Sequence, residues 1–151
     1  MTSTEQQQAS EVEAVIRDTL AAHHSMYLAT AGTAGPWNSG VYFAEVDPFT
    51  LVLVLETHGR TLTAIRENPV VGLVVSTGSP GQPFLQGRAN VEILEGEDDA
   101  EVRRVLLAKV PEAAPFMDAP ITAVRLKVPS WRVTDVMNGW LPGKELTAPG
   151  A

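Results

Sequence analysis

The stretch LVLVLETHGRTLTAIRENP (residues 51–69) joins a strand-length apolar run to a segment rich in basic and hydroxyl side chains. A second apolar run, VVGLVVS, follows directly at residues 70–76. Short apolar runs bounded by polar residues and proline are typical of buried strands. A short helix is expected over residues 60–67, and it ends there because the residue before Pro69 is disfavoured in the helical region. The stretch therefore predicts two core strands connected by one helix.

The turn after the first of these strands is a candidate binding site. It contains His58, Arg60 and Arg66 together with the hydroxyls of Thr57 and Thr61. Arginine presents a planar set of donors to a phosphate, and the free amides at a helix start add more. The turn is either solvated surface or a site for an anionic ligand. We favour the ligand for Arg60 and solvation for Arg66.

The segments on either side predict a mainly β, antiparallel barrel with about seven strands, one N-terminal helix and one helix after strand five. The strands are joined by turns rather than crossover helices, which favours antiparallel pairing. A closed or half-closed barrel also hides strand edges. The predicted strands are residues 26–31, 37–46, 51–56, 70–77, 84–94, 121–128 and 131–137. Ser10 and Glu13 form the predicted capping box of the first helix, and Asp98 and Glu101 cap the later one.

The chain is expected to form one domain, since its 151 residues leave little room for a second. Residues 1–8 are polar and Gln-rich and are expected to be disordered. The domain is placed at residues 9–146, and residues 147–151 are expected to be a flexible C-terminal tail.

Composition excludes several classes of function. The net charge of −7 argues against a nucleic-acid surface and against an anionic membrane. The absence of cysteine excludes disulfides and thiolate chemistry. No metal site is expected, because His23 and His24 are adjacent at a helix end and point about 100° apart. The N-terminal segment resembles no signal peptide, so we expect a cytoplasmic protein.

The order of these segments resembles the pyridoxamine 5′-phosphate oxidase-like, FMN-binding split-barrel family, from about residue 10 to 146. The resemblance rests on six stretches in family order: MYLAT (26–30), TAGPW (33–37), NSGVYFAEV (38–46), LVLVLETHGRTLTAIRENP (51–69), LQGRANVEIL (85–94) and PSWRVTDVMNGW (129–140). It implies a homodimeric split β-barrel with FMN in the cleft between two subunits.

The resemblance also implies residue roles around the FMN phosphate. Arg60 and Thr61 would hold the phosphate from the turn, with Thr57 nearby. Gln86 and Arg88 would reach it or the ribityl chain from the fifth strand, where they share one face. Many members carry a lysine near the position of Thr61, whereas this chain has none before residue 109. Two arginines would then share the work of a lysine and an arginine.

Aromatic side chains are expected around the flavin ring. By the same resemblance, Tyr42 or Phe43 would flank the isoalloxazine, and Trp131 or Trp140 would close over it from the partner chain. Tyr42 and Phe43 are neighbours on a strand and face opposite sides, so one of them belongs to the core.

The expected function is that of an FMN-dependent oxidoreductase acting on a small-molecule substrate, with no catalytic residue assigned. Two alternatives remain on the same barrel. One is a deazaflavin-dependent reductase. The other is a non-catalytic protein that binds haem or no cofactor. The missing lysine favours this last alternative, whereas the set Arg60, Gln86 and Arg88 favours the flavoprotein.

Overall fold

The apolar run of the quoted stretch forms a buried strand, β4 (Thr50–Glu56), in the computed structural model, which describes residues 2–151. Its antiparallel partners are β3 (Ala44–Asp47) and β7 (Ile121–Lys127). The chain then continues through α2 (Arg60–Glu67) into β5 (Val70–Val75). The predicted strand–helix–strand order of this stretch is therefore confirmed.

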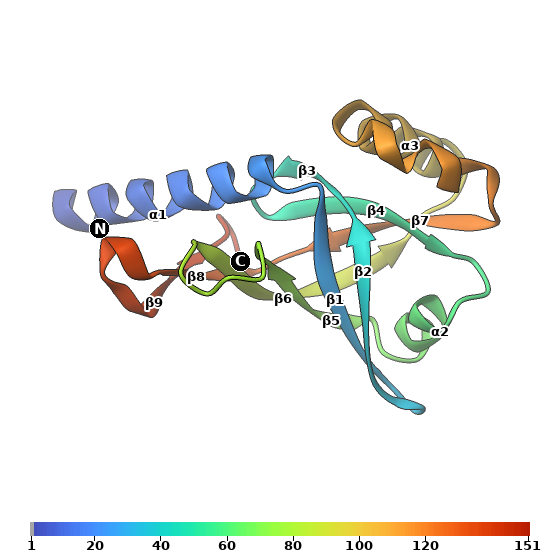
Figure 1. Ribbon diagram of the computed structural model, residues 1–151, viewed down its shortest axis with the longest axis horizontal. Coiled ribbons are helices and arrows are strands. Elements are labelled where there is room, and N and C mark those ends of the chain that lie inside the picture. Colours follow the sequence, from blue (N-terminus) through green and yellow to red (C-terminus); the bar gives the residue numbers. More distant parts are fainter. Residues whose placement is uncertain (1) are drawn as a thin grey trace.

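Every strand pairing in the sheet is antiparallel. The other strands are β1 (Ser25–Gly32), β2 (Gly35–Tyr42), β6 (Phe84–Ile93), β8 (Ser130–Asp135) and β9 (Trp140–Thr147). The helices besides α2 are α1 (Ser3–Ala22), α3 (Gly96–Lys109) and the 3-10 helices η1 (Pro111–Asp118) and η2 (Val136–Asn138). The strand order is β2-β1-β5-β6-β7-β4-β3, and β8 pairs with β6 and β9. Because β2 also contacts β4, the sheet curls into a half-barrel (Figure 1).

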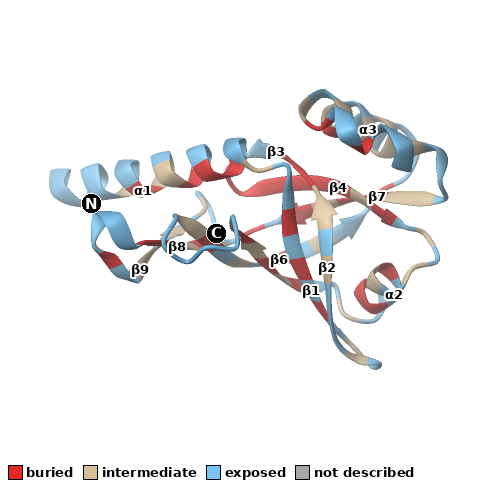
Figure 2. Ribbon diagram, viewed as in Figure 1, coloured by how far each residue is buried: buried red, intermediate tan, exposed pale blue. Residues whose placement is uncertain are grey.

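The position of β4 explains its continuous apolar sequence. Leu51, Leu53 and Leu55 point into the main core of the half-barrel, which α1 also covers. Val52 points the other way, into a second core cluster with Leu106 of α3. A strand covered on both faces needs apolar side chains at successive positions rather than at alternate ones. Figure 2 shows β4 as a buried band between the barrel and α3.

The N-terminal segment differs from the prediction. Residues 3–8 are the first turns of α1, although residues 1–8 were expected to be disordered, and residue 1 lies outside the described residues. The Thr2 hydroxyl accepts from the Glu5 amide at 3.1 Å, and the Glu5 carboxylate accepts from the Thr2 amide at 3.2 Å. This capping box, rather than the predicted one at Ser10, satisfies the first amides of the helix.

The strand count also differs from the prediction, and the described residues contain nine. The predicted strand at residues 37–46 is divided into β2 and β3 at the buried Phe43. The unpredicted β9 pairs only with β8, and its proline, glycine and charged residues mask the strand pattern. Beyond it, in the predicted tail, the Ala148 amide donates to the Pro129 carbonyl at 2.8 Å. The mainly β, antiparallel split-barrel class is confirmed despite these differences. None of the helices described in residues 2–151 is long and apolar enough to cross a bilayer.

Two strand glycines make a matched test of packing. A Cβ on Gly87 would lie 2.8 Å from Cε3 of Trp131, whereas a Cβ on Gly72 would meet nothing closer than 3.8 Å. Trp131 cannot yield easily, because it is fully buried and its indole N–H donates to the Pro48 carbonyl at 2.6 Å. We expect Gly87→Ala to lower the free energy of unfolding by about 1–3 kcal/mol, as overpacked cores do. We expect Gly72→Ala to change it by less than about 1 kcal/mol. Urea denaturation of both variants measures the difference, and equal stabilities would contradict it.

Candidate functional site

A cavity of about 540 Å³ opens where β2 approaches the end of β4. Its walls come from β1, β2, β4, the start of α2, α3, η1 and the start of β7. The lining residues are Ser25, Ser39, Gly40, Val41, Tyr42, Val54, Leu55, Glu56, Gly59, Thr61, Leu106, Ala113, Phe116 and Ile121. The curl of the sheet produces this cavity, because it brings β2 from one end of the strand order against β4 from the other.

One end of the cavity, formed by Ser39, Glu56, Gly59 and Thr61, is polar, and we call it the polar end. The hydroxyls of Ser39 and Thr61 are 2.8 Å apart and hydrogen-bond to each other, which ties β2 to α2. Gly59 is the N-cap of α2, so no side chain of the cap accepts from the amides of the first turn. Such amides are available to a ligand.

The polar end also contains a carboxylate. Oε2 of Glu56 lies 3.0 Å from the position that a Cβ on Gly59 would occupy. The carboxylate is therefore beside the start of α2, where the helix dipole favours negative charge. Among the described residues that line the cavity, Glu56 is the only acidic one and none is Lys or Arg.

The opposite end of the cavity is apolar and aromatic. Tyr42 and Phe116 meet edge to face, with ring centroids 5.8 Å apart and an interplanar angle of 66°. Leu106 and Ala113 are buried behind them on α3 and η1, and Ile121 completes the wall. This end offers apolar contact to a flat ligand, with the Tyr42 hydroxyl as a polar group.

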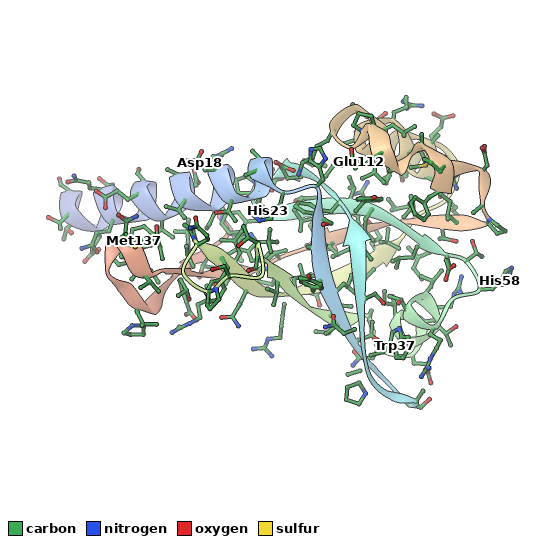
Figure 3. The ribbon with its side chains drawn as sticks, in the orientation of Figure 1. Asp18, His23, Trp37, His58, Glu112 and Met137 are labelled. Atoms are coloured by element: carbon green, nitrogen blue, oxygen red, sulfur yellow. The ribbon has the colours of Figure 1, made fainter. Side chains whose placement is uncertain are left out.

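The structure brings two of the predicted site residues, Tyr42 and Thr61, into this cavity. It also resolves the choice between neighbours, because Phe43 is fully buried in the core. Arg60 does not line the cavity. Its guanidinium carbon lies 3.9 Å from the ring centroid of Trp37, which Figure 3 shows on β2 close to α2. The Thr57 hydroxyl is 2.9 Å from that of Thr122 and ties the turn to β7.

The remaining predicted site residues lie elsewhere. Gln86 and Arg88 share the exposed outer face of β6, opposite Val74 and Gly72 of β5, and neither lines the cavity. The predicted role of Trp131, closing over the flavin ring, is wrong. It is fully buried and hydrogen-bonded to the backbone, so its ring cannot close over a ligand. The alternative Trp140 is also buried, and both indoles fill the half-barrel core.

The lining residues that the sequence did not predict include Ser39, Glu56 and Phe116. Glu56 carries a usable signal, because a charged residue that ends a fully apolar strand lies at the edge of the core. Ser39 and Phe116 have no such signal in the sequence. Ser39 reaches the cavity because β2 contacts α2, and Phe116 reaches it because η1 packs over β2.

Ionic contacts at α3 fix the apolar wall of the cavity. Asp99 Oδ1 accepts from Arg103 Nε at 2.6 Å, and Oδ2 accepts from the Ala123 amide at 3.0 Å. Arg103 also donates to the Ile121 carbonyl at 3.0 Å. Burial raises the pKa of the Asp99 carboxyl, but the hydrogen bonds from Arg103 and Ala123 outweigh it, so the pKa lies below its ordinary value. These bonds hold α3 against β7.

The end of α3 and the segment after it are held by three further contacts. Lys109 Nζ donates to the Leu20 carbonyl at 2.8 Å and pairs with Glu45 at 2.6 Å. His24 Nδ1 lies 2.7 Å from a carboxylate oxygen of Glu112. Glu112 is in the first turn of η1 (Figure 3). The hydrogen bond from His24 lowers the pKa of the Glu112 carboxyl. Within residues 2–151 no group of three or more metal-ligating side chains is arranged around a common point.

Comparison with known proteins gives a family match and several structural neighbours. The family model described as pyridoxamine 5′-phosphate oxidase matches residues 12–135. A haem-binding protein from Mycobacterium smegmatis superposes with a TM-score of 0.72 and 21% identity over 89% of this chain, which spans 57% of that protein. A NimC/NimA family protein from Clostridium acetobutylicum superposes with a TM-score of 0.64 and 15% identity. The match covers 93% of this chain and 94% of that protein. An FAD-binding protein from Mesorhizobium loti superposes with a TM-score of 0.59 and 19% identity. The match covers 74% of this chain and 84% of that protein.

Identities this low show a shared fold and nothing finer. A search of curated proteins finds no match.

The anchoring role of Asp99 can be tested by pH. Asp99→Asn removes a charged acceptor, so we expect it to lower the free energy of unfolding by about 1.5 kcal/mol at neutral pH. Because the folded-state pKa is depressed, this stabilisation is present above the ordinary carboxyl pKa and is lost as pH falls through the folded value. The deficit of the variant should therefore shrink in acid. The exposed Asp98→Asn is the matched control, and denaturation at several pH values that showed the same deficit throughout would contradict the assignment.

Proposed function

The chain belongs to the pyridoxamine 5′-phosphate oxidase-like split-barrel family, and from this premise we propose that it binds a flavin in the cavity and uses it to oxidise or reduce a small molecule. The observation that carries the proposal is one cavity that combines an aromatic, apolar end with a polar end at a helix start. A flavin has the same division, with a flat ring at one end and a hydroxylated chain at the other.

The apolar end fits the ring. The volume of about 540 Å³ lies within the range of about 300–1,000 Å³ that is usual for small-molecule pockets. Tyr42 and Phe116 offer aromatic contact, and Phe116 is 53% exposed, so its ring has apolar surface that a flat ligand can cover. A bound flavin supplies the hydride or electron transfer, and the residues of this chain position it and exclude water.

The polar end fits the ribityl chain and, in part, a phosphate. The hydroxyls of Ser39 and Thr61 can exchange their mutual bond for bonds to ribityl hydroxyls. The first-turn amides of α2 and the side chain of Arg60 are the donors for the FMN phosphate. Arg60, beside this end at the start of α2, is the arginine available to a phosphate here, because Arg88 lies on the outer face of β6.

A second copy of the chain would cover an exposed apolar face of the sheet. Tyr27, 50% exposed, and Val70, 41% exposed, lie on the outer face of β1 and β5. Tyr27 pairs with Gly40, and Ala29 pairs with Gly72, so this face is apolar and flat enough for close approach. We place a homodimer interface here, with Gln86 and Arg88 of each subunit directed toward the other.

A haem-binding function has less support from the cavity. The Mycobacterium smegmatis neighbour binds haem. In this chain, however, no His, Cys or Met lines the cavity within the described residues, and Tyr42 is the only lining side chain of a type that ligates haem iron. A non-catalytic ligand-binding role remains the alternative, and it is distinguished by whether purified protein reduces and reoxidises its flavin in the presence of an electron donor.

The flavin proposal predicts a coloured or reconstitutable protein. We expect purified protein, mixed with FMN and desalted, to retain flavin absorbance. Arg60→Ala should weaken FMN binding about tenfold or more, because a hydrogen bond to a charged group is lost. Arg66→Ala is the matched control, since Arg66 is on the last turn of the same helix and reaches only the Thr57 carbonyl at 3.5 Å. Calorimetry that detects no FMN binding to the wild type would exclude the proposal.

The dimer proposal predicts that a charge in the interface converts the protein from a dimer to a monomer. Tyr27→Glu places a charge at the centre of the proposed interface, so we expect it to give monomers in sedimentation analysis. Val46→Glu is the matched control, because Val46 is 60% exposed on β3 and lies outside that face. A monomeric wild type, or dissociation by both variants, would contradict the interface.

A further inference from the structure

The charge of the polar end is opposite to what a phosphate needs. A phosphate dianion is bound by clustered cationic donors. Here the lining residues include one carboxylate, Glu56, and no Lys or Arg within the described chain. Arg60 is the nearest Lys or Arg to Glu56 in the sequence, and its guanidinium is on the face of Trp37.

Glu56 has no evident structural role that would explain its place. Within residues 2–151 its carboxylate forms no ion pair, whereas seven other acidic side chains do. It is the exposed last residue of β4, and its backbone already pairs with Ile121 of β7. The side chain folds over Gly59 at the start of α2, which is the position that an anionic ligand group would occupy.

Gly59 makes this arrangement possible. Any side chain at this N-cap would collide with Glu56, since the position of a Cβ is 2.9 Å from Glu56 Cβ and 3.0 Å from Oε2. The carboxylate therefore places a negative charge beside the start of α2, next to where a ligand group would meet the first-turn amides. A like charge within about 4–6 Å of a phosphate disfavours its ionised form and its binding.

We propose that Glu56 is a specificity-determining residue that opposes Arg60, so that the cavity selects its ligand by the ring and hydroxylated chain rather than by a phosphate. The ligand class is then a flavin-like molecule whose group at α2 is uncharged, such as an alcohol. This inference rests on the proposed flavin function. It differs from the expectation of FMN selectivity, because one arginine and one glutamate at the same helix start offset each other.

Riboflavin and FMN provide a matched ligand pair for the test, because they differ only in the phosphate. Their dissociation constants are measured by quenching of flavin fluorescence on the full chain at neutral pH. For the wild type we expect the two constants to agree within about threefold. Glu56→Gln keeps the size of the side chain and removes its charge. It should tighten FMN binding about tenfold, the equivalent of about 1.4 kcal/mol, and leave riboflavin binding unchanged within about twofold.

Glu97→Gln is the control for net charge, since Glu97 is an exposed residue of the first turn of α3 and does not line the cavity. It should leave both constants unchanged. Circular dichroism and thermal unfolding show whether each variant is folded, and Glu56→Asp, which keeps the charge, serves as a second variant and should not gain affinity for FMN.

The outcomes separate this inference from the function on which it rests. If wild type and variants bind neither flavin, the proposed function fails and the inference with it. If the wild type binds FMN more than about tenfold tighter than riboflavin, and Glu56→Gln does not change the ratio, the flavin function stands and the role of Glu56 is overturned. A gain for FMN in Glu97→Gln equal to that in Glu56→Gln would also overturn it.

Discussion

The burial of β4 on both faces is the constraint on which the rest of the molecule depends. One face must contact the half-barrel core and the other must contact α3, so the strand cannot move without opening two apolar clusters. Each buried leucine contributes roughly 1.5–3 kcal/mol through burial, which makes the position of the strand unambiguous. Where β4 ends, at Glu56, the chain must turn, and the start of α2 is placed beside the edge strand β2. The cavity is a consequence of this turn.

Electrostatics at the turn then decide what the cavity can hold. The helix start favours an anion, and in this molecule two groups respond to that field. Glu56 places a carboxylate beside the helix start, whereas Arg60 adds positive charge but packs on the Trp37 ring and does not line the cavity. In a chain with a net charge of −7, one arginine cannot make a strongly electropositive pocket against a carboxylate a few residues away. The balance of these two side chains therefore matters more than the total charge of the protein.

Local sequence predicts the parts of this architecture that have local causes. The extent of α2 follows from Asn68 and Pro69, and β4 follows from its uninterrupted apolar run. β9 escaped prediction because its pairing with β8, and not its own pattern, makes it a strand. The site shows the same division. Thr61 was predicted to hold a phosphate from the turn in which it lies, and it lines the cavity, although its role stays a prediction. The placement of Arg88 on another face depends on the curl of the whole sheet, which no short segment encodes.

The structural neighbours indicate that the choice of ligand depends on the side chains that line the cavity rather than on the fold. Proteins with this fold include one that binds haem and one that binds FAD, at about 20% identity to this chain. The barrel therefore supplies a cleft and leaves the chemistry of the ligand to the residues that line it. In this chain the aromatic pair Tyr42 and Phe116 favours a flat ring, and the lack of a histidine, cysteine or methionine in the described lining disfavours haem iron. Under the proposed flavin function, the remaining choice concerns the polar group of the ligand, and the carboxylate of Glu56 at the start of α2 opposes a phosphate there.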